Sequence, residues 1–134
     1  MYQKIIVALS LEHGISDQAI KAARAMKDDG GEIIAIHVYE PLQGSASTFV
    51  SKEAVDNAIQ HAKDALAARV GDHPDLQSEL IKGHSGRAIT DYARKVGADC
   101  IVIGSHEPGL RDFLLGSTSA RVVRHAPCSV HVLR

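Results

Sequence analysis

The sequence of 134 residues contains only two cysteines, four prolines and no tryptophan, and aromatic residues make up 4% of it. Cys100 and Cys128 are widely separated, so they cannot form the close pairs that hold structural zinc, and we expect no metal site. No apolar run approaches the ~20 residues of a membrane-spanning helix. Neither sign of charge dominates, because 15 Lys and Arg face 16 Asp and Glu. A nucleic acid or an anionic membrane is therefore not an expected partner.

The remaining composition is that of a globular protein with a real core. Apolar residues make up 45% of the chain and charged residues 23%, and no linker, internal repeat or low-complexity segment interrupts it. We therefore expect one domain over residues 1–134. The chain enters a strand-like run directly after Lys4, without the features of a secretory signal, which favours a cytoplasmic protein. Both cysteines lie in or beside apolar runs and are expected to be buried thiols.

Strand-like and helical patterns alternate along the whole chain. The expected strands are continuous apolar or alternating runs at 4–9, 32–39, 76–82, 98–104 and 129–133. Between them, apolar residues recur at helical spacing over 19–26, 54–70, 88–96 and 118–125. The run Asp28-Asp29-Gly30-Gly31 is expected to stop the first helix, and Ser85 is the expected N-cap of the third. This order predicts an α/β fold, a single doubly wound, five-stranded parallel sheet with helices on both faces.

Ligands of such sheets bind at the carboxyl ends of the strands, where the strand order reverses. Glycines and hydroxyls gather at that place in two segments, around Gly104-Ser105-His106 and at Gly116-Ser117-Thr118-Ser119. Glycine permits close approach to a ligand, and the start of a helix favours an anion such as phosphate. The alternative is purely structural, with Gly116 forming a turn and Ser117 capping a helix.

Known catalytic and phosphate-binding motifs are missing. The sequence has no G-x-x-x-x-G-K-[ST] loop, no G-x-G-x-x-G after a strand and no G-x-S-x-G elbow. Nucleotide hydrolysis would need a carboxylate to hold magnesium, and the nearby candidates are Glu12, Glu107 and Asp112. We therefore assign no catalytic residue and expect any turnover to be slow.

The C-terminal third of the chain carries a specific combination of motifs. The run from Ile101 to His106, the segment Leu114-Leu115-Gly116-Ser117-Thr118 and the run from Val122 to Val130 occur in this order. Together with the first strand and the Gly83-x-x-Gly86 turn, they resemble the universal stress protein family over the whole chain. The resemblance implies the strand order 3-2-1-4-5, a homodimer, a role in the stress response and, in one subgroup, ATP or another adenine nucleotide at the switch point, with magnesium as its candidate companion.

By position, the resemblance implies two groups of binding residues. Those on the adenosine side are Ala8, Leu9, Ser10 and Val38. Those around the ribose and phosphates are Gly104, Ser105, His106, Gly109, Gly116, Ser117, Thr118 and Ser119. The chain departs from the nucleotide-binding pattern at Ser10, where an aspartate is usual, and at Glu107, where a second glycine is usual. The loop before Gly116 is also one residue short, as in a branch with a His-x-Pro loop.

Two alternatives to a nucleotide-binding regulator remain open from the sequence. In the first, the protein is a nucleotide-free dimeric scaffold that acts through another protein. In the second, it is a slow ATPase. We also expect a two-fold dimer through the strand 129–133, because this last strand should lie at a sheet edge with unpaired backbone groups. The alternative is a monomer whose edge is protected by the terminal Arg134.

Overall fold

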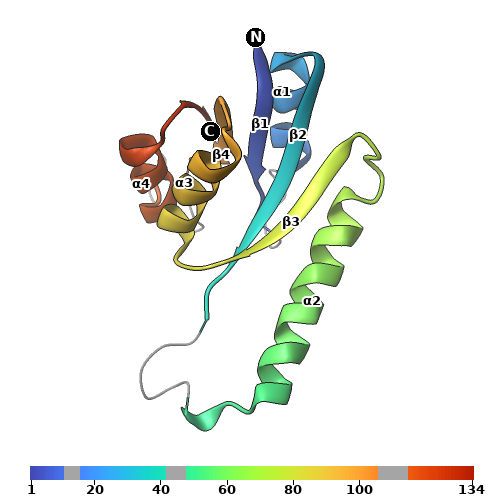
Figure 1. Ribbon diagram of the computed structural model, residues 1–134, viewed down its shortest axis with the longest axis vertical. Helices are drawn as coiled ribbons and strands as arrows, with labels where there is room; N and C mark the ends of the chain where they lie inside the picture. Colours follow the sequence, from blue (N-terminus) through green and yellow to red (C-terminus); the bar gives the residue numbers. More distant parts are fainter. Residues whose placement is uncertain (11–15, 42–47, 106–114) are drawn as a thin grey trace.

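The computed structural model describes residues 1–10, 16–41, 48–105 and 115–134 (Figure 1). In these parts of the chain, five strands alternate with four helices. They are β1 (Tyr2–Ala8), α1 (Ser16–Met26), β2 (Lys27–Tyr39), α2 (Lys52–Val70), β3 (Leu76–Lys82), α3 (Ser85–Val96), β4 (Cys100–Gly104), α4 (Ser117–His125) and β5 (Ser129–Leu133). None of these helices is long and apolar enough to cross a membrane.

The strands form one parallel sheet in the order β3-β2-β1-β4-β5, which confirms the expected topology. β1 is the central strand, with Ile6 opposite Ile34 of β2 on one side and Ile101 of β4 on the other. The carboxylate of Asp99 accepts hydrogen bonds from the backbone amides of Gln3 and Lys4, both at 2.9 Å. These contacts fix the start of β1 beside the start of β4.

Two apolar cores lie on opposite faces of the sheet, and β1 contributes to both of them. Ile5 and Val7 pack with residues of α1 and α2, such as Ala23 and Leu66. Ile6 points to the other face and packs in the cluster that holds residues of α3 and α4. Successive side chains of a strand point to opposite faces, which explains why a strand buried on both sides reads as a continuous apolar run. The expected doubly wound architecture is therefore confirmed.

The start of β2 differs from the prediction. Asp28-Asp29-Gly30-Gly31 was expected to stop the first helix, and α1 does end before it, at Met26, but the second strand begins at Lys27 rather than at Glu32 and includes this run. The pairing register shifts between Tyr2 and Lys4 of β1, which lie opposite Lys27 and Glu32 of β2. The residues of β2 between these two positions therefore form an irregular stretch, like a β-bulge. Gly30 has a positive φ of 78°, a conformation that glycine adopts without strain. Contacts from far away in the sequence hold this stretch, since Asp28 accepts hydrogen bonds from the amino terminus and from Gln3.

The two cysteines differ in burial. Cys100 is buried as expected, with 1% of its surface exposed, whereas Cys128 is only half-buried, so the expectation was wrong for this residue. Burial raises the pKa of the Cys100 thiol to about 11. The thiol therefore stays protonated near neutral pH, and the thiolate, which is the reactive form, is scarce.

This difference predicts selective alkylation. At pH 8 we expect iodoacetamide to modify Cys100 at least about 100-fold more slowly in the folded protein than in concentrated urea, because access requires the core to open. Cys128 serves as the internal control and should react faster in the folded state. Peptide mass spectrometry of timed samples measures both rates, and equal rates for Cys100 with and without urea would contradict its burial.

Candidate functional site

The carboxyl ends of β1, β2 and β4 lie at one edge of the sheet because the three strands are parallel neighbours. The connection after β1 leads to α1 on one face, whereas α4, which follows β4, lies on the other face. The edge between β1 and β4 is therefore the switch point that the sequence predicted, and it is where ligands of such sheets bind.

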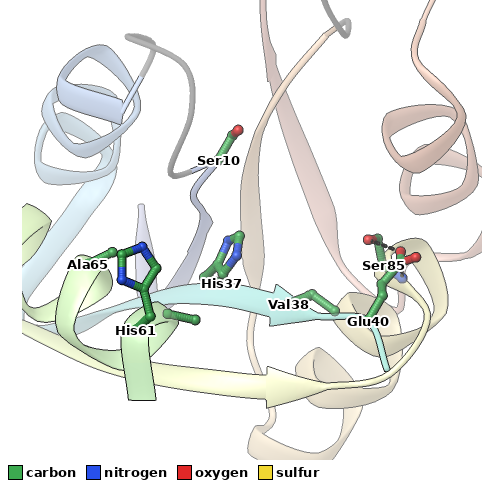
Figure 2. A pocket seen from close by; sticks show the side chains of 8 residues that line it. Ser10, His37, Val38, Glu40, His61, Ala65 and Ser85 are labelled. Atoms are coloured by element: carbon green, nitrogen blue, oxygen red, sulfur yellow. Dashed lines mark hydrogen bonds between the residues drawn. The ribbon is translucent and has the colours of Figure 1, made fainter. Parts of the chain in front are cut away.

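A pocket of about 720 Å³, a size typical of small-molecule sites, opens next to this point, at the carboxyl ends of β1 and β2. Its walls come from the end of β1, from β2, from α2 and from the start of α3 (Figure 2). The lining residues are Ser10, His37, Val38, Glu40, His61, Ala62, Ala65 and Ser85. Figure 2 shows His37 and His61 toward one end, Glu40 and Ser85 toward the other, and Val38 between them.

His37 is tied to the strand beside it. Its Nδ1 lies 3.0 Å from the backbone carbonyl oxygen of Leu9, a distance at which the ring nitrogen donates a hydrogen bond to that carbonyl. The Leu9 amide in turn donates to the carbonyl of Ile36 over 2.8 Å. These contacts fasten the end of β1 to β2 and set the position of Ser10, the next residue.

Glu40 caps the start of α3 from another element. Its Oε1 accepts hydrogen bonds from the Ser85 amide, at 3.0 Å, and from the Ser85 hydroxyl. These bonds, the hydroxyl first, hold the pKa of the Glu40 carboxyl below its ordinary value. The expectation that Ser85 is the N-cap was wrong, since the N-cap is His84, whose side chain makes no capping bond. A carboxylate thus occupies this helix start.

The acid range offers a test of this cap. Glu40→Gln should lower the free energy of unfolding at pH 7 by about 0.5–1 kcal/mol, as expected for a partly exposed helix cap. A carboxyl with a lowered pKa stabilises the fold above its ordinary pKa and loses that effect as the pH falls. The difference from wild type should therefore disappear near pH 3. Urea denaturation at both pH values measures it, and Asp56→Asn on α2 is the control. A difference that persists at pH 3 would contradict the assignment.

A second group of residues joins β4 to α4. The Gly116 amide donates to the carbonyl of Ser105 over 2.8 Å, and the Ser119 hydroxyl donates to the carbonyl of Gly104. These contacts bring 104–105 and 116–119 together, although ten residues separate the two segments. The Ser119 hydroxyl is engaged in the fold, and Ser105 is buried, whereas Ser117 is exposed and Thr118 partly so.

The start of α4 differs from the start of α3 in its electrostatics. Gly116 is its N-cap and, as a glycine, makes no side-chain capping bond, and the first turn of α4 holds no acidic residue. The free amide groups of such a helix start, with the positive end of the helix dipole, favour an anion. Of these two helix starts, one is occupied by the Glu40 carboxylate, whereas the other has no capping carboxylate among the residues that the structure describes.

The structure places the predicted residues in different ways. Ser10 and Val38 line the pocket, whereas Leu9 is buried in the core and Ala8 is half-buried. The predicted residues outside the described parts of the chain are Glu12, His106, Glu107, Gly109 and Asp112. Among the described residues, no group of three or more His, Cys, Asp or Glu could hold a metal ion.

Sequence analysis did not single out three lining residues of the pocket. Glu40 carried no motif, and His37 follows an apolar run that reads as packing. His61 lies on α2 one turn before Ala65, on the same side of the helix as Ala62. The small residues on that side were the available signal, but only the packing of α2 shows that they face a pocket.

Comparison with known proteins decides the family. The family description "universal stress protein family" matches residues 1–134. The chain belongs to the universal stress protein family. It is 34% identical to universal stress protein G of Shigella flexneri over 145 residues, covering all of both chains. It is also similar to the structure of the universal stress protein UspA from Lactobacillus plantarum, with 29% identity and a TM-score of 0.79, covering 99% of this chain and 98% of that one.

Other universal stress proteins of similar fold have been solved with adenine nucleotides. One is a complex with cAMP (23% identity, TM-score 0.63, 99% of this chain and 97% of that one). Another, from Archaeoglobus fulgidus, is a complex with dAMP (21% identity, TM-score 0.64, 99% of this chain and 98% of that one). A third, from Arabidopsis thaliana, has AMP bound (20% identity, TM-score 0.60, 98% of this chain and 90% of that one). At these sequence identities, the comparison shows only that these proteins share the fold of this chain.

Proposed function

We propose that this universal stress protein is a stress-response regulator that binds an adenine nucleotide at the β1/β4 switch point. The observation that carries the proposal is the contrast between the starts of α3 and α4. The Glu40 carboxylate occupies the start of α3 and would repel phosphate, whereas α4 has no acid in its first turn and no capping carboxylate among the described residues. A nucleotide would therefore direct its phosphates to α4 and its base toward Val38 and Glu40.

The dimensions of the sheet support this orientation. The pocket wall at Val38 belongs to β2, and Gly104 ends β4, so β1 alone separates them. Two strand spacings amount to about 10 Å, which a nucleoside with its phosphates can span. In this pose Ala8, Leu9, Ser10 and Val38 contact the adenosine. The residues around the ribose and the phosphates are then Gly104, Ser105, His106, Gly109, Gly116, Ser117, Thr118 and Ser119. The complexes of related proteins with AMP, dAMP and cAMP support the choice of adenine.

The first experiment asks what the purified protein carries. The protein is denatured directly after purification, released nucleotides are identified by mass spectrometry, and the emptied protein is titrated with ATP and AMP, with and without magnesium. We expect an adenine nucleotide, either released or bound in the titration. An empty protein with no affinity at millimolar ATP would overturn the proposal and leave the nucleotide-free scaffold.

The proposal includes a homodimer through β5. Among the described strands, β5 pairs with β4 alone, and Val130, His131, Val132 and Leu133 are all partly exposed. On α4, Val123 is 47% exposed and lies roughly 200° around the helix from Arg121. Because Arg121 contacts α3, Val123 lies on the side of α4 that points away from α3. Burial against a second copy would explain both features.

A charge at this edge tests the dimer. Val123→Glu should weaken dimerisation by at least about tenfold, because a carboxylate would be buried in the interface. Sedimentation velocity over a range of protein concentrations measures the effect. Phe49→Glu, at an exposed apolar residue far from β5, is the control. A wild-type protein that remains a monomer would contradict the expectation, and so would an unchanged dimer of Val123→Glu.

Two further expectations belong to the proposal. The whole chain, residues 1–134, acts as one domain. The protein works in the cytoplasm, where thiols stay reduced, which agrees with two cysteines that are free.

A further inference from the structure

The outer sides of α3 and α4 form a continuous surface that is rich in arginine. The two helices lie side by side on the same face of the sheet (Figure 1). Arg87 and Arg94 are exposed on α3, and Arg121 and Arg124 are exposed on α4. Asp91 is the acidic residue among them. We call these five residues the basic face. They carry a net charge of +3, so the rest of a chain of net charge −1 carries −4.

Contacts between the helices hold the arginines in place. Gly86 of α3 lies against the stem of Arg121, where an added Cβ would come within 2.7 Å of the Arg121 Cδ. At the other end, Arg94 donates a hydrogen bond to the carbonyl of His125 over 3.2 Å. These two contacts bring Arg121 against the first turn of α3, which carries Arg87, and bring Arg94 to the end of α4. A stem that is already packed loses little entropy when its guanidinium binds a ligand.

Stabilisation of the helices does not explain the basic face. Positive charge is favourable in the last turn of a helix, which accounts for Arg94 and Arg124. Arg87, however, lies in the first turn of α3, where the helix dipole disfavours it, and Arg121 lies in the middle of α4. Asp91 pairs with Arg87 at 3.7 Å and with Arg94 at 3.5 Å. Among the described residues, Arg121 and Arg124 have no such ion pair.

The chemistry of the face indicates the kind of partner. Guanidinium groups pair with carboxylates through two parallel hydrogen bonds, which lysine cannot do. The face is small, since Arg87 and Arg94 are about 10 Å apart along α3. The remainder of the surface is negative and would repel a long polyanion such as DNA or an anionic bilayer, which extends beyond the face. A short carboxylate-rich segment matches both its size and its charge.

We propose that the basic face docks a short acidic segment, rich in Asp or Glu, of another protein. This inference does not depend on nucleotide binding, because the basic face lies on the outer sides of the helices and the pocket lies at the sheet edge.

The test uses the full chain and a fluorescent twelve-residue helical peptide with glutamates along one side. A peptide with glutamines in their place is the ligand control. Anisotropy titrations at 50 mM salt should show saturable binding of the glutamate peptide that weakens as the salt concentration rises. The double variant Arg87→Gln and Arg121→Gln should weaken binding by at least about tenfold. Glutamine is a good helix former and both positions are exposed, so the fold should persist, which circular dichroism checks.

A matched variant separates docking from general electrostatics. Lys52→Gln and Lys63→Gln on α2 change the net charge by the same amount, and should weaken binding less than about twofold. Equal weakening by both double variants would overturn the proposal, as would no saturable binding by the wild type. Duplex DNA or phosphatidylserine vesicles that bind as tightly through the same arginines would also overturn it, in favour of a polyanionic partner. If the glutamine variant does not fold, Arg87→Glu, which the helix dipole favours, replaces it.

Discussion

Placing a carboxylate at the start of α4 is expected to reduce the affinity for ATP by at least about 100-fold, or about 2.7 kcal/mol. The double variant Gly116→Asp and Ser117→Ala puts a negative charge where we propose that the phosphates bind, and it removes one hydroxyl. The backbone permits the change, because Gly116 has φ −61° and ψ 159°, which any residue adopts, and aspartate is a favoured N-cap. Gly116 is buried, so a thermal melt that matches wild type is what separates loss of binding from loss of structure.

Isothermal titration with ATP and with AMP measures this effect, and a thermal melt confirms folding. Ser51→Asp is the matched control, because Ser51 is the N-cap of α2 and the change adds the same charge at another helix start. It should alter the affinity less than about twofold. An unchanged ATP affinity of the double variant would defeat the proposed site, even if the wild-type protein binds nucleotide elsewhere.

The largest effect on stability is expected for Ile101→Ala, at about 4 kcal/mol. Ile101 lies in β4 opposite Ile6 of β1 and Val130 of β5, and none of its surface is exposed. Truncation removes buried methyl groups and leaves a cavity that a sheet covered by α3 and α4 cannot close, and such changes typically cost 2–5 kcal/mol. This is a large part of the stability of a typical domain.

Urea denaturation followed by circular dichroism measures the loss. Phe49→Ala is an informative control, because it deletes a larger side chain that is 87% exposed, and we expect a change of less than about 0.5 kcal/mol. Similar losses for both variants would mean that the burial of Ile101 does not determine its contribution.

The sheet could be predicted from the sequence because its signals are local. The apolar runs at Ile5-Ile6-Val7 and Ile101-Val102-Ile103 indicate strands buried on both faces, whichever elements cover them. The start of β2 could not be predicted in the same way. Asp28 to Gly31 has the composition of a turn, and the contacts that extend the strand come from Met1 and Gln3, which are distant in sequence.

In the candidate site, too, the residues with a local sequence signal were predictable and the others were not. Gly116 and Ser117 were identified because glycine and hydroxyl residues at a helix start form a local pattern. The partner of Ser85 is Glu40, which follows β2 and is distant in sequence, so no local pattern argued against Ser85 as an N-cap. His61 faces the pocket only because of how α2 packs. Residues whose roles depend on tertiary contacts were therefore the ones missed.

The central position of β1 links the candidate site to the opening motions of the whole protein. β1 is paired on both sides, is buried in both cores and leads directly into Leu9 and Ser10. Fraying at this strand would break two ladders and expose two cores at once, so its amide protons should exchange with solvent only through global unfolding. A ligand that contacts Ser10 would then slow exchange throughout the sheet rather than in one loop. Amide exchange in strands far from the pocket would therefore report whether the pocket is occupied.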